Sequence, residues 1–157
     1  MSQIIENDMM MDVLQEDESL KNKYLAFIVE DEHFAVEVAQ IKEIMGVVPI
    51  TNIPRTEDYI KGIINLRGDI VPVVDVRVRF MKPELPYDQT TCIVVVEYQD
   101  YSLGLVVDSI LGIYTFVDEM MAPPPNAKLS YANQFVRNIG RAEDGTKLLL
   151  DLEKLIF

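Results

Sequence analysis

Asp69 and Asp75 are the two residues whose type and spacing most resemble a pair of catalytic carboxylates. General acid–base hydrolysis uses two such groups that face one substrate. An even spacing of six residues places both on one face of a regular strand. Asp69, however, follows a glycine turn and Asp75 ends an apolar run, positions that are typical of turn and strand-end acids. The sequence therefore keeps an acid–base enzyme only as an unfavoured alternative.

The other residues that could carry chemistry give no second site. His33 is the single histidine and lies beside a turn of three acids at 30–32, with no second histidine or cysteine nearby to share a metal ion. Cys92 is the single cysteine and opens an apolar run, which predicts a small buried residue and excludes an internal disulfide. Neither GxGxxG nor GxxxxGK occurs, so the usual phosphate-binding loops are absent. We expect no metal, no cofactor and no catalysis.

The charge of the chain disfavours a nucleic-acid partner. Fourteen Lys and Arg against 26 Asp and Glu give a net charge of −12 over 157 residues, which repels a phosphate backbone. Residues 1–20 contain six acids and no Lys or Arg, so half of the charge lies there. We interpret 1–22 as an acidic N-terminal extension, which is either mobile or weakly helical, or docked as a short amphipathic helix.

Membrane insertion is not expected. The chain has no run of eighteen uncharged apolar residues, and its first residues lack the basic region of a secretory signal. These features predict a cytoplasmic protein.

Alternating and β-branched runs interrupted by turn residues predict four β-hairpins. The hairpins are expected over 24–38, 59–77, 91–107 and 139–150.

Helical turns and one linker are expected between these hairpins. Apolar residues three apart predict one or two helical turns over 39–44, followed by a strand through 47–48. Short helical segments are also expected at 131–136 and 151–157. Pro83 and Pro86 indicate an internal linker near 82–88.

An internal repeat indicates two similar halves. A shift of 69 residues aligns one apolar set with another, namely Phe34, Val36, Val38, Ile41 and Ile44 with Leu103, Leu105, Val107, Ile110 and Ile113. A hairpin followed by a short helix then occurs twice, which favours two β subdomains packed together. The alternative is that any two hairpins align this well.

The block 60–77, which reads IKGIINLRGDIVPVVDVR, closely resembles the central motif of the CheW family of bacterial chemotaxis coupling proteins. The segments 41–44, 103–108 and 148–155 are similar to the same family, so the resemblance covers 23–157. It implies a mostly β fold of two small five-stranded SH3-like barrels around a shared hydrophobic core, with a few short helices. It further implies a non-catalytic adaptor recruited to chemoreceptor arrays, which binds the regulatory domain of the histidine kinase CheA and the chemoreceptor cytoplasmic tip.

The resemblance also suggests residues for partner binding. Arg67, beside a glycine turn, is the best candidate for a functional charge, because its guanidinium can grip a carboxylate. We hypothesise that Glu43 is its partner, which anchors the predicted helix at 41–44 to the 65–68 hairpin and shapes a groove for the receptor helix. The alternative is an exposed pair worth about 0–1 kcal/mol and without function.

Four further residues belong to this candidate site. Ile41 and Ile44 are either apolar anchors for a partner helix or core residues. Lys61 and Asn65 flank the same hairpin and are candidates for contact with either partner. Kinase contacts are not assigned, because the alternation of Val94 and Val96 fits both core and edge strands.

Two adaptor alternatives stay open at this point. The same domain occurs fused to a receiver in CheV-type proteins and at the end of CheA, but these 157 residues contain no receiver or kinase segment, which favours a stand-alone adaptor. A coupling protein of a different receptor–kinase pathway, such as one for surface motility, has the same sequence features.

Overall fold

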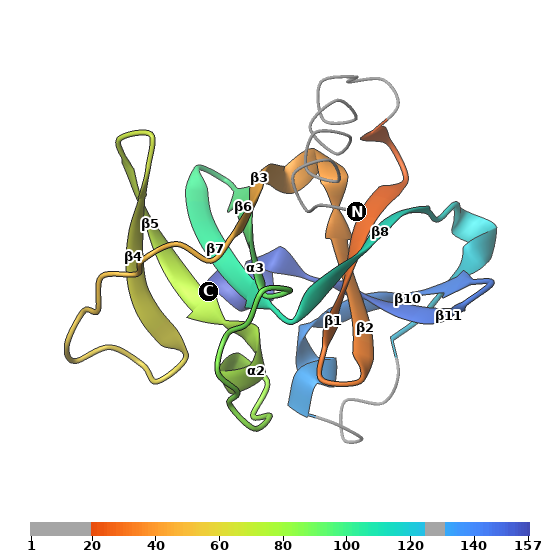
Figure 1. Ribbon diagram of the computed structural model, residues 1–157. Coiled ribbons are helices and arrows are strands. Elements are labelled where there is room, and N and C mark those ends of the chain that lie inside the picture. The colour runs from red at the N-terminus through yellow and green to blue at the C-terminus, as the bar shows by residue number, and fades with distance from the viewer. Residues whose placement is uncertain (1–19, 125–130) are drawn as a thin grey trace.

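The computed structural model describes residues 20–124 and 131–157, and β-strands dominate these residues (Figure 1). The strands are β1 (Lys23–Val29), β2 (Glu32–Glu37), β3 (Ile41–Gly46), β4 (Ile60–Leu66), β5 (Asp69–Asp75), β6 (Cys92–Tyr98), β7 (Tyr101–Val107), β8 (Ser109–Thr115), β9 (Met121–Ala122), β10 (Val136–Ala142) and β11 (Gly145–Leu150). Short helices are α2 (Val76–Arg79) and α3 (Leu152–Ile156), with 3-10 turns at η2 (Val38–Gln40), η3 (Asp118–Met120) and η4 (Tyr131–Phe135). The mostly β prediction is confirmed. Most of the acidic extension at 1–22 lies outside the described residues.

The strands form two sheets that exchange one strand each. Their orders are β8-β1-β2-β11-β10-β9 and β3-β6-β7-β5-β4 in the described part of the chain. The hairpin β1–β2 is followed by β3, which pairs with β6 of the other sheet, and the hairpin β6–β7 is followed by β8, which pairs with β1. The bounds of β1 and β6, 23–29 and 92–98, differ by 69 residues, so the hairpins of the predicted repeat are confirmed. The short helix predicted after each hairpin is wrong, because the strands β3 and β8 follow them.

The prediction of a helix over 39–44 was wrong beyond its first two residues. Only Val38–Gln40 form a 3-10 turn, and Ile41–Gly46 form the strand β3. Ile41 pairs with Val96 and Ile44 with Val94, and the register shifts between Ile41 and Glu43. This bulge lets two residues three apart both point into the core, which imitates helical spacing in the sequence. The strand expected through 47–48 is absent, since these residues have no ladder pairing.

Each sheet closes on itself, as barrels require. Beyond β3, Thr51 pairs with Ile63 of β4 through two hydrogen bonds of 2.9 Å, which joins the two edges of the five-stranded sheet. Gly62 has φ +145°, and a Cβ there would lie 2.0 Å from the backbone oxygen of Thr51, so only glycine permits this approach. In the other sheet, β9 follows β8 and pairs with β10. The sixth strand is therefore a two-residue closure of a five-stranded barrel.

The two barrels share their largest apolar core. One cluster combines Leu25 and Phe34 of the six-stranded sheet with Val94 and Leu105 of the five-stranded sheet, and these four side chains are fully buried. The alternate residues of β6, such as Ile93, pack instead inside their own barrel. Val94 and Val96 are thus core residues of a central strand, which settles the question that their alternation left open.

The predicted linker at 82–88 joins strands of one sheet and does not separate the two sheets. Residues 82–88 join α2 to β6, and the strands on either side of that connection, β5 and β6, belong to the same sheet. The chain passes between sheets at η2 and at Asp108. Figure 1 shows the β4–β5 hairpin at one end of the molecule and the β10–β11 hairpin at the other. The four predicted hairpins and the helical segments near 131–136 and 151–157 are all present.

Candidate interaction site

The β4–β5 turn presents Arg67 to solvent. Leu66 pairs with Asp69, so Arg67 and Gly68 are the two loop residues, with φ of 53° and 93°. Two positive φ values match a type I′ turn, whose twist suits a tight hairpin. The side-chain oxygen of Asn65 accepts the backbone N–H of Gly68 at 2.8 Å, which holds the turn. The side chain of Arg67 is 79% exposed.

Arg67 and Glu43 form the ion pair that the sequence suggested. The distance from Arg67 Nη2 to Glu43 Oε1 is 3.2 Å, and the Glu43 side chain is 20% exposed. Glu43 lies on β3 and Arg67 follows β4, two strands at opposite edges of the sheet order, so the pair spans the closure of the barrel. The anchored element is therefore a strand and not the predicted helix. An exposed pair of this kind adds only about 0–1 kcal/mol to folding stability.

The other four candidate residues lie in different environments. Ile41 and Ile44 pack in the shared core with 8% and 6% exposure, which favours the core interpretation over exposed anchors. Lys61 lies on β4 and pairs with Glu84 of the 82–88 segment. The structure thus brings Glu43 of β3 to the β4–β5 turn, which Asn65 stabilises and which carries Arg67.

The geometry does not support an acid–base pair. Asp69 is exposed at the first position of β5, and Asp75 is buried at the last. Six residue steps of about 3.3 Å separate them by roughly 20 Å, beyond the roughly 5–9.5 Å between paired catalytic carboxyl groups. Asp75 is instead the N-cap of α2, where its Oδ1 accepts the N–H groups of Arg77 and Val78.

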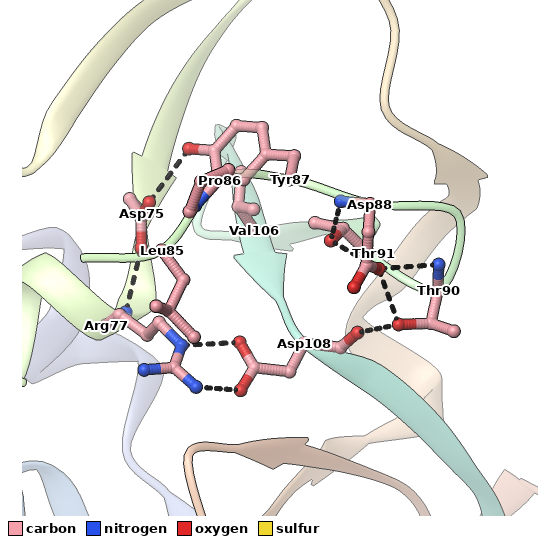
Figure 2. Close-up of a pocket in the computed structure, with 10 residues that line it drawn as sticks. All are labelled: Asp75, Arg77, Leu85, Pro86, Tyr87, Asp88, Thr90, Thr91, Val106 and Asp108. Carbon is pink, nitrogen blue, oxygen red and sulfur yellow. Dashed lines mark hydrogen bonds and ion pairs between the residues drawn. The ribbon is translucent and has the colours of Figure 1, made fainter. Parts of the chain in front are cut away.

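A polar network around Asp75 was missed by the sequence analysis. The Tyr87 hydroxyl donates to Asp75 Oδ2 at 2.8 Å beside a pocket of about 120 Å³ (Figure 2). Burial, followed by the hydrogen bond to Asp75, raises the pKa of Tyr87. On the other side of the pocket, Arg77 donates two hydrogen bonds to the carboxylate of Asp108. Arg77 and Asp108 are 31 residues apart, a distance at which no local sequence pattern predicts a pair.

The described residues contain neither a metal-binding cluster nor a membrane-spanning helix. Within 20–124 and 131–157, no group of three or more His, Cys, Asp or Glu side chains is arranged to hold a metal ion. No helix in that same part of the chain is long and apolar enough to cross a bilayer.

Comparison with known proteins decides the family. A family model described as the CheW-like domain matches residues 23–156. The chain belongs to the CheW family. The resemblance seen in the block 60–77 is confirmed, and the match covers the whole described part of the chain except for residues 20–22 and 157.

Individual CheW proteins are similar to this chain over most of its length. It is 31% identical to the chemotaxis protein CheW of Klebsiella aerogenes over 139 residues, which is 88% of this chain and 84% of that protein. It is 34% identical to a probable chemotaxis protein CheW of Rhizobium etli over 83% of this chain and 84% of that protein. The crystal structure of the scaffolding protein TtCheW from Thermoanaerobacter tengcongensis superposes with a TM-score of 0.77 at 29% identity, covering 83% of this chain and 88% of that one.

Proposed function

We propose that this chain is a non-catalytic chemotaxis adaptor that couples chemoreceptors to the histidine kinase CheA. One surface binds the cytoplasmic tip of the receptor and another binds the regulatory domain of the kinase, so that the chain is recruited to receptor arrays at the membrane. The observation that carries this proposal is the CheW-like match over 23–156 on a closed double-barrel fold. The separation of Asp69 from Asp75 argues against the one acid–base pair that the sequence offered.

The receptor-binding surface in this proposal is centred on the β4–β5 hairpin. Arg67 is exposed yet held by Glu43, so its charge is offered at a defined position. Ile70, which pairs with Asn65 across the hairpin, is 59% exposed and adds an apolar contact next to that charge. A charge beside an apolar side chain suits one face of an amphipathic receptor helix. Lys61 lies at the far end of β4 from this turn.

Ile41 and Ile44 contribute indirectly in this account. Their side chains anchor β3 in the shared core, and β3 carries Glu43. The two isoleucines therefore set the position of the Glu43–Arg67 pair without contacting the receptor.

The coupling within this pair is tested by a double-mutant cycle with Glu43→Ala and Arg67→Ala. The affinity for a purified receptor cytoplasmic fragment is measured for the two single variants and the double variant. We expect the double variant to lose no more affinity than the worse single variant, because either change alone disrupts the pair. Strictly additive losses would show that the two residues act independently and contradict the proposed unit.

Lys42→Ala is the matched control for that cycle. Lys42 neighbours Glu43 on β3, and its exposed ion pair with Glu97 is 3.9 Å long. We expect this variant to bind the receptor fragment as the original chain does. An equal loss for Lys42→Ala would mean that any charge change on β3 weakens binding.

A direct binding experiment tests both partners. The chain is immobilised and offered the CheA regulatory domain and the receptor fragment separately. Binding of both supports the adaptor, whereas failure to bind either refutes it for this receptor–kinase system. The same assay with receptor and kinase fragments of a motility pathway distinguishes the other adaptor alternative.

A further inference from the structure

Arg77 connects the five-stranded sheet to neighbouring segments with all of its side-chain nitrogens. Figure 2 shows the two bonds that it donates to Asp108. It lies in α2, directly after β5. Its Nε and Nη2 donate to the two carboxylate oxygens of Asp108 at 2.8 and 2.7 Å, and its Nη1 donates to the backbone oxygen of Pro83 at 2.9 Å. A guanidinium engaged on three nitrogens has one orientation, since its donors form a rigid planar fork. The hydrogen bonds to Asp108 raise the pKa of Arg77 above the already high value of an ordinary arginine.

Asp108 lies where the chain passes from one sheet to the other. It follows β7 of the five-stranded sheet and precedes β8 of the six-stranded sheet. Its Oδ2 also accepts the backbone N–H of Glu30 at 2.8 Å, and its own N–H donates to the carbonyl of Ile28 at 3.0 Å. Its carbonyl accepts the hydroxyl of Thr90 at 3.0 Å. Asp108 is therefore bonded to the end of β1, the β1–β2 turn, α2 and the segment before β6.

Lys82 adds a second connection at this junction between the two sheets, the region around Asp108 and the β1–β2 turn. Its Nζ donates to the carboxylates of Glu30, in the β1–β2 turn, and Glu32, at the start of β2 in the six-stranded sheet. The Lys82 side chain is only 10% exposed, and its backbone N–H donates to the carbonyl of Arg77 at 2.8 Å. Lys82 thus contacts the β1–β2 region directly, whereas Arg77 reaches the same turn through Asp108.

Directional bonds at this junction have a role that the apolar core cannot supply. Hydrophobic burial favours contact between the sheets, but it is non-directional and tolerates small rotations. Charge-assisted hydrogen bonds with fixed geometry select one orientation, as buried polar groups do in some systems. The Arg77 and Asp108 side chains are 12% and 28% exposed, so water does not fully replace their bonds when the sheets shift.

We propose that Arg77 and Asp108, together with Lys82 and Glu30, are positioning residues that fix the relative orientation of the two sheets. That orientation matters when receptor and kinase are bound at the same time, because their binding surfaces then have to keep a fixed angle. The first half of this proposal, the fixed orientation of the sheets, concerns the free chain alone. The second half, the need for that orientation when both partners are bound, rests on the proposed function.

The first half is tested by measuring the distance between spin labels on the two sheets. Labels are placed at Glu97→Cys on β6 and Thr146→Cys on β11, both exposed positions, in a chain with Cys92→Ala. We expect a narrow distance distribution with Arg77 present and a broader one with Arg77→Gln. Arg77→Lys is expected to broaden it as well, because one ammonium cannot make the two parallel bonds. An unchanged distribution in Arg77→Gln overturns the proposal.

Two controls separate positioning from loss of stability. Arg137→Gln removes the Arg137–Glu37 pair, an exposed pair of 3.5 Å within the six-stranded sheet. Val71→Ala makes a cavity inside the five-stranded barrel, away from the junction. Both are expected to keep the narrow distribution. Broadening in Val71→Ala equal to that in Arg77→Gln would show a purely structural effect and overturn the positioning role.

The second half is tested with both partners. Arg77→Gln is expected to bind the receptor fragment and the CheA regulatory domain separately as the original chain does, while receptor-dependent kinase activity in the three-part assembly falls at least about fivefold, the lower range of allosteric coupling. Full activity with a broadened distance distribution overturns this half. If the original chain binds neither partner, the proposed function fails and this half with it, whereas the distance measurement still decides the first half.

Discussion

The carboxylate of Asp75 accepts hydrogen bonds from two separate segments of the chain. Its Oδ1 caps α2, and its Oδ2 accepts the hydroxyl of Tyr87, which comes from the irregular segment before β6. The sequence identified it correctly as a strand-end acid, because an acid that ends an apolar run is a common helix cap. Its bond to Tyr87 could not be predicted, since the two residues are joined through a proline-containing loop whose path depends on tertiary packing.

Replacement of this cap is expected to destabilise the fold. Asp75→Ala removes an N-cap, worth about 1 kcal/mol, and leaves the half-buried Tyr87 hydroxyl without its acceptor, worth about 1–3 kcal/mol. The free energy of unfolding, measured with urea, should therefore fall by roughly 2–4 kcal/mol. Asp151→Ala is the control, because Asp151 caps α3 through a single bond to the Glu153 N–H, and it should cost about 1 kcal/mol. Equal losses would contradict the role given to Tyr87.

Tyr114 is expected to make stability depend on pH in the alkaline range. Its hydroxyl donates to Asp144 at 2.5 Å, and burial, then this bond, raises its pKa from 10.0 to about 12. A raised pKa means that the neutral phenol favours the folded state, so its contribution is complete below pH 10, decreases between pH 10 and 12, and is lost above. The difference in unfolding free energy between the chain and Tyr114→Phe should shrink over that range. A difference that grows with pH would contradict this assignment.

At the scale of elements, the sequence predicted the hairpin of each repeat but not the strand that follows it, β3 or β8. Turn residues predicted the hairpins, because hairpin pairing is local and glycine or acidic turns determine it. The exchanged strand β3 was predicted as a helix, because its bulge gives helical spacing and its partner β6 lies about fifty residues away. The exchange of β3 and β8 is a long-range pairing that no local pattern contains.

Closure of the five-stranded barrel depends on Gly62. In Gly62→Ala the new Cβ would lie 2.0 Å from the Thr51 oxygen, at a φ that L-residues rarely adopt, so the Thr51–Ile63 pairing has to break. Strain of about 1–3 kcal/mol adds to the lost hydrogen bonds, and we expect a loss of roughly 3 kcal/mol or more in urea unfolding. Gly46→Ala on β3 is the control, because nothing lies within 4 Å of its Cβ position. A mild effect at Gly62 would show that closure does not need this contact.

At the scale of the whole molecule, the exchanged strands and the shared core make the two barrels one folding unit. Buried side chains of both sheets pack in the same cluster, so neither barrel keeps its core without the other. The sequence repeat predicted two similar subdomains, and the family resemblance supplied the shared core. The junction formed by Arg77 and Asp108 was beyond both, because it depends on how the subdomains are oriented.

This shared core predicts a single cooperative unfolding transition. Circular dichroism, which follows the strands, and tyrosine fluorescence, which follows side-chain packing, should give the same midpoint in urea. Two separated transitions would mean that one barrel survives alone and would contradict the shared core as the main source of stability.

The central claim is that the chain makes the kinase responsive to the receptor. The most direct measurement is phosphate transfer from ATP by CheA in the presence of receptor cytoplasmic fragments on vesicles, with and without the chain. We predict that receptor control of the kinase requires the chain, and that Arg67→Ala weakens this control. Kinase activity that ignores the receptor when all three components are present would contradict the account.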